Sequence, residues 1–149
     1  MERSLLDRLA GHHRTVKGII ERARPLLADD GPPVPLEVGR LRWEMVRALT
    51  AYQQFKHREI FDPAILRGSP QLTQMAKALK ADCTVVGDMF TDHVRDWSGR
   101  GTGDEWSAYR PASLAMIDRI ERHLRREQQN ICSLLRAGRV AAPQLWPQR

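Results

Sequence analysis

Four long segments in which apolar residues recur every three or four positions limit this chain to very few folds. That spacing places the apolar residues on one face of an α-helix. Breaks rich in Gly, Pro, Asp and Ser separate the segments at residues 29–35, 68–70 and 98–103. Short connections between long amphipathic helices favour antiparallel neighbours. The sequence therefore predicts an all-α fold, an up-down-up-down four-helix bundle.

Capping residues and helix breakers place the ends of the first two helices. Ser4, with Asp7 three residues later, resembles a capping box and marks the start of the first helix. The second helix is expected to run from about Leu36 to about Phe61. Pro63 then ends it, because a proline has no backbone N–H and disfavours a helical residue before it.

The other two helices occupy the second half of the chain. The third begins after residues 68–70, and Gly87 inside it makes it the least secure of the four. Thr102 with Glu105 resembles a second capping box and opens the fourth helix. Gly138 is expected to stop that helix at its C-terminal end.

The expected organisation is one domain, the bundle at residues 1–138, followed by a C-terminal tail at residues 139–149. A chain of 149 residues suits one domain and can bury a core without disulfides. The tail is either loose or docks on the bundle through Leu145 and Trp146. Deep burial is expected for residues on the inner stripes, among them Val16, Leu49, Leu79, Val86, Met116 and Ile120.

Composition and charge argue against several functional classes. The net charge is +6, but the charges are spread over every helix, so a nucleic-acid partner is not expected. No apolar run approaches the roughly 18 residues of a membrane span, and the first residues do not resemble a signal peptide. We therefore expect a cytoplasmic protein with no membrane partner. Cys83 and Cys132 match no metal or redox spacing and are expected to be reduced thiols.

Polar residues interrupt the apolar stripes at a few positions, and these are the candidates for function. His13, His57 and His123 lie on inner stripes, and Glu127 follows His123 by four positions. An imidazole and a carboxylate at this spacing project from one side of a helix and can reach the same ion. A metal or an imidazolium partner would also offset the cost of burying the carboxylate. The residues leave both readings open, a bound metal or a buried polar network.

Several of these segments resemble the hemerythrin-like, or HHE cation-binding, family. The segment HLRREQQNICSLL at residues 123–135 is similar to the HxxxE motif of that family's last helix. QQFKHREIFDPAI at residues 53–65 resembles the second-helix motif, and GHHRTVKGII at residues 11–20 resembles the first, favouring His13 over His12. The resemblance extends to the aromatic residues of the segment 90–109. It implies a bundle whose core holds iron or a similar metal.

The chain departs from the family pattern in two of its helices. Aligned on Pro63, Gln53 stands where the family has His, and His57 stands where it has Glu. In the third helix, the depth that matches the other ligands is expected near residues 76–80, which contain no conventional ligand. His93 lies about 20 Å further along the helix, so we do not expect it to be a ligand. A full two-iron site is therefore not expected.

The candidate residues that remain could hold a single Fe or Zn ion as the cofactor, or none. Its expected ligands are His13, His57, His123 and Glu127, with His12 and Gln53 as weaker candidates.

Two functions follow as hypotheses. The first is a hemerythrin-like protein that binds one metal ion and handles iron or senses oxygen or nitric oxide. The second is a metal-free bundle that acts as a protein-interaction or signalling module, with a homodimer or another protein as partner. The sequence shows no nucleophile–base pair and no phosphate-binding loop, so an enzyme is not favoured.

Overall fold

The computed structural model describes residues 4–28, 35–98, 105–141 and 144–146. Within these ranges all regular structure is helical and no strand occurs, which confirms the all-α prediction. None of the helices in this part of the chain combines the length and apolar character needed to cross a bilayer. The elements are α1 (Leu5–Ala28), α2 (Pro35–Phe55), the π-helix η1 (Lys56–Phe61), α3 (Asp62–Arg67), α4 (Pro70–Trp97) and α5 (Trp106–Ala141).

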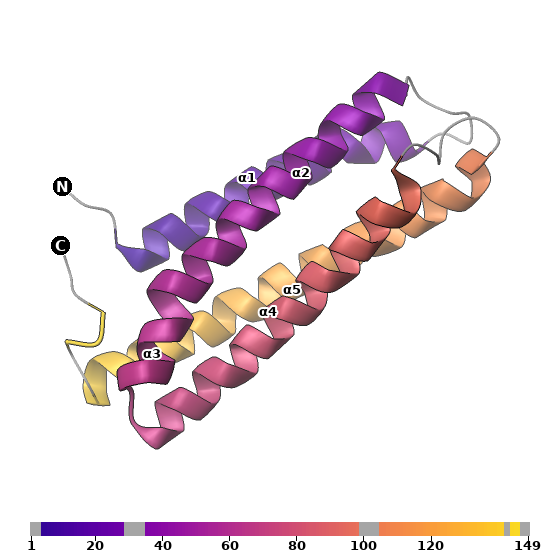
Figure 1. Ribbon diagram of the computed structural model, residues 1–149. Helices are drawn as coiled ribbons and strands as arrows, with labels where there is room; N and C mark the ends of the chain where they lie inside the picture. Colours follow the sequence, from indigo (N-terminus) through magenta and orange to yellow (C-terminus); the bar gives the residue numbers. More distant parts are fainter. Residues whose placement is uncertain (1–3, 29–34, 99–104, 142–143, 147–149) are drawn as a thin grey trace.

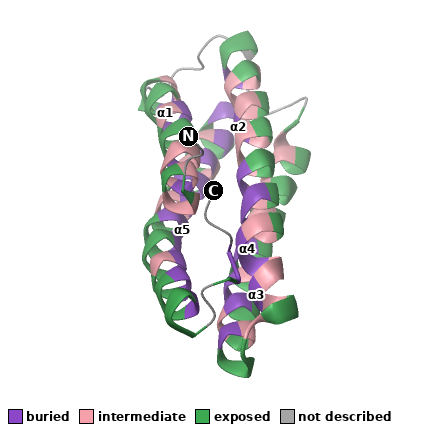
Figure 2. Ribbon diagram, turned by 90° about the vertical axis from the view of Figure 1, so that its left-hand side faces the viewer, coloured by how far each residue is buried: buried purple, intermediate pink, exposed green. Residues whose placement is uncertain are grey.

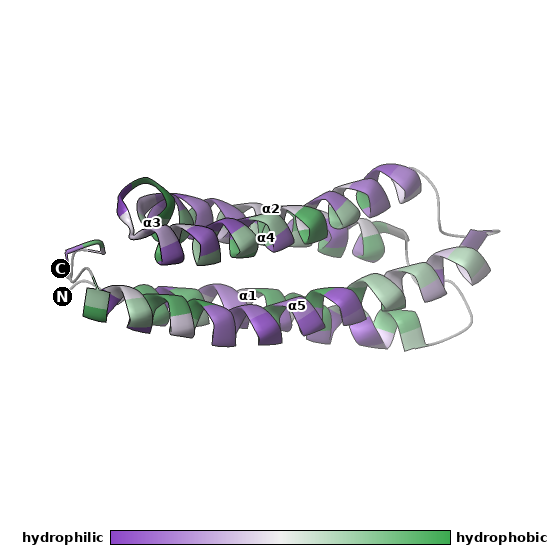
Figure 3. Ribbon diagram, turned by 90° about the horizontal axis from the view of Figure 1, so that it is seen from below, coloured by the Kyte–Doolittle hydropathy of each residue, from purple (hydrophilic) through white to green (hydrophobic). Residues whose placement is uncertain are grey.

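The helices lie side by side along one common direction (Figure 1). Because α2, η1 and α3 follow one another without a break, they form a single rod beside the rods of α1, α4 and α5. Seen from below, across the length of the helices, α1 and α5 form one layer and α2 and α4 the other (Figure 3). The buried residues of each helix face the space between these layers (Figure 2). This interior is where polar side chains need partners.

The core is built from the predicted inner stripes, with one exception. Val16, Leu79, Val86, Met116 and Ile120 are buried, as predicted. Leu49 is only partly buried, so its prediction was wrong. The deepest stripe of α2 is the neighbouring one, which carries the buried residues Met45, Tyr52 and Phe55.

Side-chain caps begin two of the helices. The hydroxyl of Ser4 accepts a hydrogen bond from the Asp7 amide at 3.1 Å, as the sequence predicted. The hydroxyl of Ser69 accepts one from the Leu72 amide at 3.3 Å at the start of α4. Each cap satisfies a backbone donor that the first helical turn leaves without a partner. The predicted cap at Thr102 lies outside the described residues.

The predicted end of the second helix at Pro63 was wrong, because the helical rod continues through α3 to Arg67. A proline normally breaks a helix by removing one hydrogen bond and by clashing with the carbonyl four residues earlier. Here the π-helix widens the turn just before Pro63, and the Asp62 amide donates to the carbonyl of His57, five residues back. The wider turn accommodates the proline ring at the start of α3.

The predicted stop at Gly138 was also wrong, since α5 continues to Ala141. Gly138 has a packing role instead, because a Cβ atom there would overlap the ring of Trp146. Trp146 is buried and its Nε1 atom donates to the carbonyl of Ile60 at 3.1 Å, and Leu145 is buried beside it. Residues 144–146 therefore dock on the bundle, which decides between the two alternatives left open for this part of the tail.

Candidate functional site

A buried ion pair lies in the interior of the bundle. Glu127, on α5, and Lys56, the first residue of η1, are each only 2% exposed. The Lys56 ammonium lies 2.7 Å from Oε1 of Glu127 and 2.8 Å from Oε2, so it donates to both carboxylate oxygens. Two opposite charges are therefore removed from water together, and each offsets the burial cost of the other.

Two aromatic side chains extend this pair toward α1. The Tyr52 hydroxyl donates to Oε1 of Glu127 at 2.6 Å. Its oxygen also lies 2.7 Å from Nε2 of His13, and it accepts from that nitrogen because its own proton is used on the carboxylate. The Lys56 ammonium lies 3.8 Å from the centroid of the Tyr52 ring, in cation–π contact. The resulting network joins α1, α2, η1 and α5.

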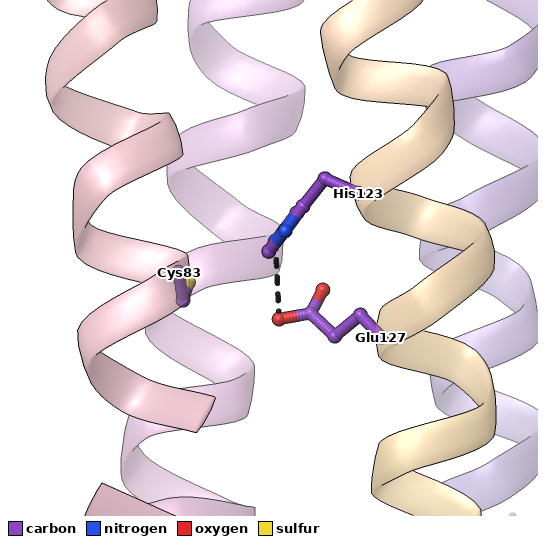
Figure 4. Close-up of side chains that lie close together, drawn as sticks. All are labelled: Cys83, His123 and Glu127. Atoms are coloured by element: carbon purple, nitrogen blue, oxygen red, sulfur yellow. Dashed lines mark ion pairs between the residues drawn. The ribbon is translucent and has the colours of Figure 1, made fainter. Parts of the chain in front are cut away.

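Two further side chains border the carboxylate on its other side. Nε2 of His123 lies 3.2 Å from Oε2 of Glu127, close enough for an ion pair. The two atoms are not aligned for a hydrogen bond, so this buried nitrogen has no hydrogen-bond partner among the described residues. Cys83, on α4, faces both residues across the interior (Figure 4). One ligand atom each from Cys83, His123 and Glu127 lies within 4.8 Å of the others.

The environment of the cluster fixes most of its charge states. Burial alone would raise the pKa of Glu127, but nearby His123 and Lys56 outweigh it and lower that pKa to about 2. Burial lowers the pKa of His13 to about 4, and it raises the pKa of the Cys83 thiol. Burial, and then the charge of Glu127, raise the pKa of Tyr52. At neutral pH the cluster therefore contains an ionised Glu127, a neutral His13 and a protonated thiol.

The structure brings together three of the four residues expected as metal ligands. His13, His123 and Glu127 belong to the cluster, with Tyr52 between His13 and the carboxylate. His57 is only partly buried, its ring lies 5.7 Å from that of Phe61, and its Nε2 atom has no hydrogen-bond partner among the described residues. The residue before it, Lys56, reaches Glu127 instead.

The weaker candidates have other contacts. The ring of His12 is stacked on that of Phe55, with 5.0 Å between the centroids. Gln53 lines a cavity beside the cluster, where its amide lies against Gly87. Gly87 lies inside the continuous helix α4, and its missing side chain leaves room for this amide.

The expected depth of the site on the third helix was wrong by about one turn. We expected it near residues 76–80, whereas Cys83 is the α4 residue that faces Glu127. His93 lies elsewhere, with Nε2 3.4 Å from the hydroxyl of Ser113. Ser113 precedes His123 by ten residues on α5, which is about 15 Å along the helix. This position agrees with the expectation that His93 is not part of the site.

Sequence reasoning missed three members of the cluster: Lys56, Tyr52 and Cys83. Lys56 follows Tyr52 by four positions on the deepest stripe of α2, but a lysine is normally assigned to the surface. Cys83 follows Leu79 by four positions on the inner stripe of α4, but two cysteines far apart in a sequence do not by themselves indicate a shared site. The sequence signal for these two residues was a charged or thiol side chain on an otherwise apolar stripe.

A metal fits this cluster only at the expense of the ion pair. Cys83, His123 and Glu127 offer sulfur, nitrogen and oxygen, a ligand set that suits Zn²⁺. The Lys56 ammonium already contacts both oxygens of Glu127. A metal bound to that carboxylate would have to displace Lys56 within the interior.

Comparison of the chain with protein-family models, with curated protein sequences and with solved structures finds no match. The hemerythrin-like relationship therefore rests on the sequence motifs alone and stays a prediction.

Proposed function

We propose that this protein is a hemerythrin-like, up-down-up-down bundle that works as a metal-free interaction or signalling module. One observation carries the proposal, the position of Lys56 on both oxygens of the buried Glu127. An ammonium in this place supplies the positive charge that a metal ion would otherwise supply to the carboxylate. The short connections between long, side-by-side helices support the antiparallel order of the bundle.

The energetics of the interior favour this arrangement. Removing one partner of a buried ion pair typically costs about 3–5 kcal/mol, because the other charge stays behind without compensation. A metal ion that bound Glu127 and displaced the Lys56 ammonium would impose such a cost, since Lys56 is as deeply buried as its partner. The metal would also have to remove the proton of the Cys83 thiol, whose pKa is raised by burial.

Binding of a single Fe or Zn ion, with a role in iron handling or in sensing oxygen or nitric oxide, is the second candidate. The grouping of Cys83, His123 and Glu127 favours it. In this reading Lys56 swings away when the ion enters, and Glu127→Ala abolishes binding because it removes the carboxylate ligand.

Elemental analysis of protein purified without a histidine tag, followed by titration with Zn²⁺ and Fe²⁺, separates the two candidates. The metal-free module predicts far less than one metal ion per chain in the wild type. The variant Lys56→Met should then bind Zn²⁺ at least tenfold more tightly than the wild type, because the carboxylate is released. Lys80→Met, which removes a lysine from the partly exposed pair with Asp62, is the matched control and should leave the affinity unchanged.

About one equivalent of iron or zinc in the wild type, lost in Glu127→Ala, would instead establish the second candidate.

A further inference from the structure

A cavity of about 260 Å³ lies beside the polar cluster, between α2, α4 and α5. It lies along the seam between α2 and α4, with residues of α5 at its base. Its walls are mostly apolar and include Val46, Leu49, Val86, Phe90, Ile120 and Leu124. The exposed residue Thr91 stands at its rim. This shape, an apolar pocket with a few polar groups at one end, is typical of small-molecule sites.

The inner end of the cavity contains a polar atom that contacts the Glu127 carboxylate at 3.2 Å without the alignment of a hydrogen bond. His123 lines the cavity, is 7% exposed, and its Nε2 atom makes no hydrogen bond within the described residues. A buried polar atom without a hydrogen bond is destabilising, so a ligand that supplies a hydrogen-bond acceptor there binds more tightly. The amide of Gln53 lies at the same end, beside Gly87.

Charge and size narrow the class of ligand. Glu127 and Lys56 neutralise each other beside the cavity. Arg95, which also lines the cavity, is paired with Asp92 and Asp96. A charged ligand would therefore meet no free countercharge and would lose its hydration. An apolar cavity of about 150 Å³ is known to hold benzene. The larger cavity here has room for one or two aromatic rings, and it is below the usual size of a drug-sized site, which begins at about 300 Å³.

We propose that this cavity binds a neutral aromatic molecule of one or two rings whose single oxygen substituent accepts a hydrogen bond from His123. The rings lie between Leu49 on α2 and Phe90 on α4, and the oxygen points to the inner end of the cavity. The inference deepens the proposed function, because it names the ligand class of the module, and it does not depend on the metal measurements.

Isothermal titration calorimetry with three probes tests the ligand class. 1-Naphthol should bind, naphthalene should bind about three- to tenfold more weakly because it lacks the oxygen, and 1-naphthoate should bind more weakly still because its charge is desolvated. In His123→Phe, the affinity for 1-naphthol should fall to that for naphthalene, while the affinity for naphthalene stays unchanged. That difference separates a hydrogen bond from a general loss of structure.

Variants that fill the cavity test its location. Leu49→Trp should abolish binding of 1-naphthol, and Leu41→Trp is the matched control, since both are partly buried leucines of α2 but Leu41 lies outside this cavity. Thr91→Trp fills the cavity from its exposed rim and should also weaken binding at least tenfold while leaving the core intact. Circular dichroism verifies that each variant is folded.

Three results would overturn the inference: no binding of 1-naphthol at millimolar concentration, tighter binding of 1-naphthoate, or binding that Thr91→Trp leaves unchanged. Each of them leaves the metal analysis of Lys56→Met unaffected, so the proposed function can stand when this inference fails.

Discussion

Replacing Glu127 by Gln removes the negative charge of the buried pair with almost no change in shape. The Lys56 ammonium is then left in the interior at 2% exposure without a countercharge. Uncompensated charges of this kind typically cost about 3–5 kcal/mol. Lowering the pKa of Glu127 from 4.5 to about 2 corresponds to about 3 kcal/mol in favour of the charged carboxylate, which agrees with that range. We expect Glu127→Gln to lower the free energy of unfolding by about 3–5 kcal/mol at pH 7.

The second half of the test is a double-mutant cycle with Lys56→Met. That single change leaves Glu127 without its ammonium and should cost a similar amount. The double variant removes both charges, so it should be more stable than the sum of the single losses predicts, with a coupling energy of at least about 2 kcal/mol. Urea unfolding followed by circular dichroism gives the three values.

The pH dependence supplies an independent check with a defined sign. Because the pKa of Glu127 is lower in the folded protein than in the unfolded chain, the pair stabilises fully above about pH 4.5. This contribution is lost as the pH falls from there through about 2, and Glu127→Gln should lack that part of the acid transition. Glu44→Gln, at the exposed pair with Arg22, is the control and should cost far less because water screens that pair. Additive single losses, each below about 1 kcal/mol, would refute the reasoning.

Four other predictions concern the docked tail and the polar network. Trp146→Ala should lower the free energy of unfolding by about 3–5 kcal/mol, measured by urea unfolding. Gly138→Ala should destabilise the wild type, because the new methyl group overlaps the ring of Trp146. In the Trp146→Ala background the same substitution should stabilise the protein by about 0.5–1 kcal/mol. A change in unfolding free energy of the same sign in both backgrounds would contradict this packing. Tyr52→Phe should lower the free energy of unfolding by about 1–3 kcal/mol, since Glu127 and His13 both lose a hydrogen-bond partner. No change in stability would exclude the network. Burial lowers the pKa of His13 to about 4, so between about pH 4 and 6.5 the unfolded chain binds a proton that the folded protein does not. The free energy of unfolding should therefore rise with pH across this window. A pKa of His13 near 6.5, measured by NMR titration of the folded protein, would disprove this prediction.

The sequence alone determined the helical class and most of the core. Apolar residues at helical spacing place Val16, Met116 and Ile120 inside because a helix repeats its faces every 3.6 residues, whatever it packs against. The same local logic found the cap at Ser4 and singled out His123 and Glu127, which are one turn apart on α5.

Tertiary structure decided how these helices meet and which polar groups become partners. The identity of Glu127's main partner depends on the angular position of Lys56 at the start of a π-helix, and on the alignment of α2 against α5. Gly138 reads locally as a helix stop, but Trp146, which packs against it, gives it another role. Cys83 reaches the site because of the axial offset between α4 and α5. Helix periodicity fixes which face is buried, whereas register between helices depends on packing among residues distant in the sequence.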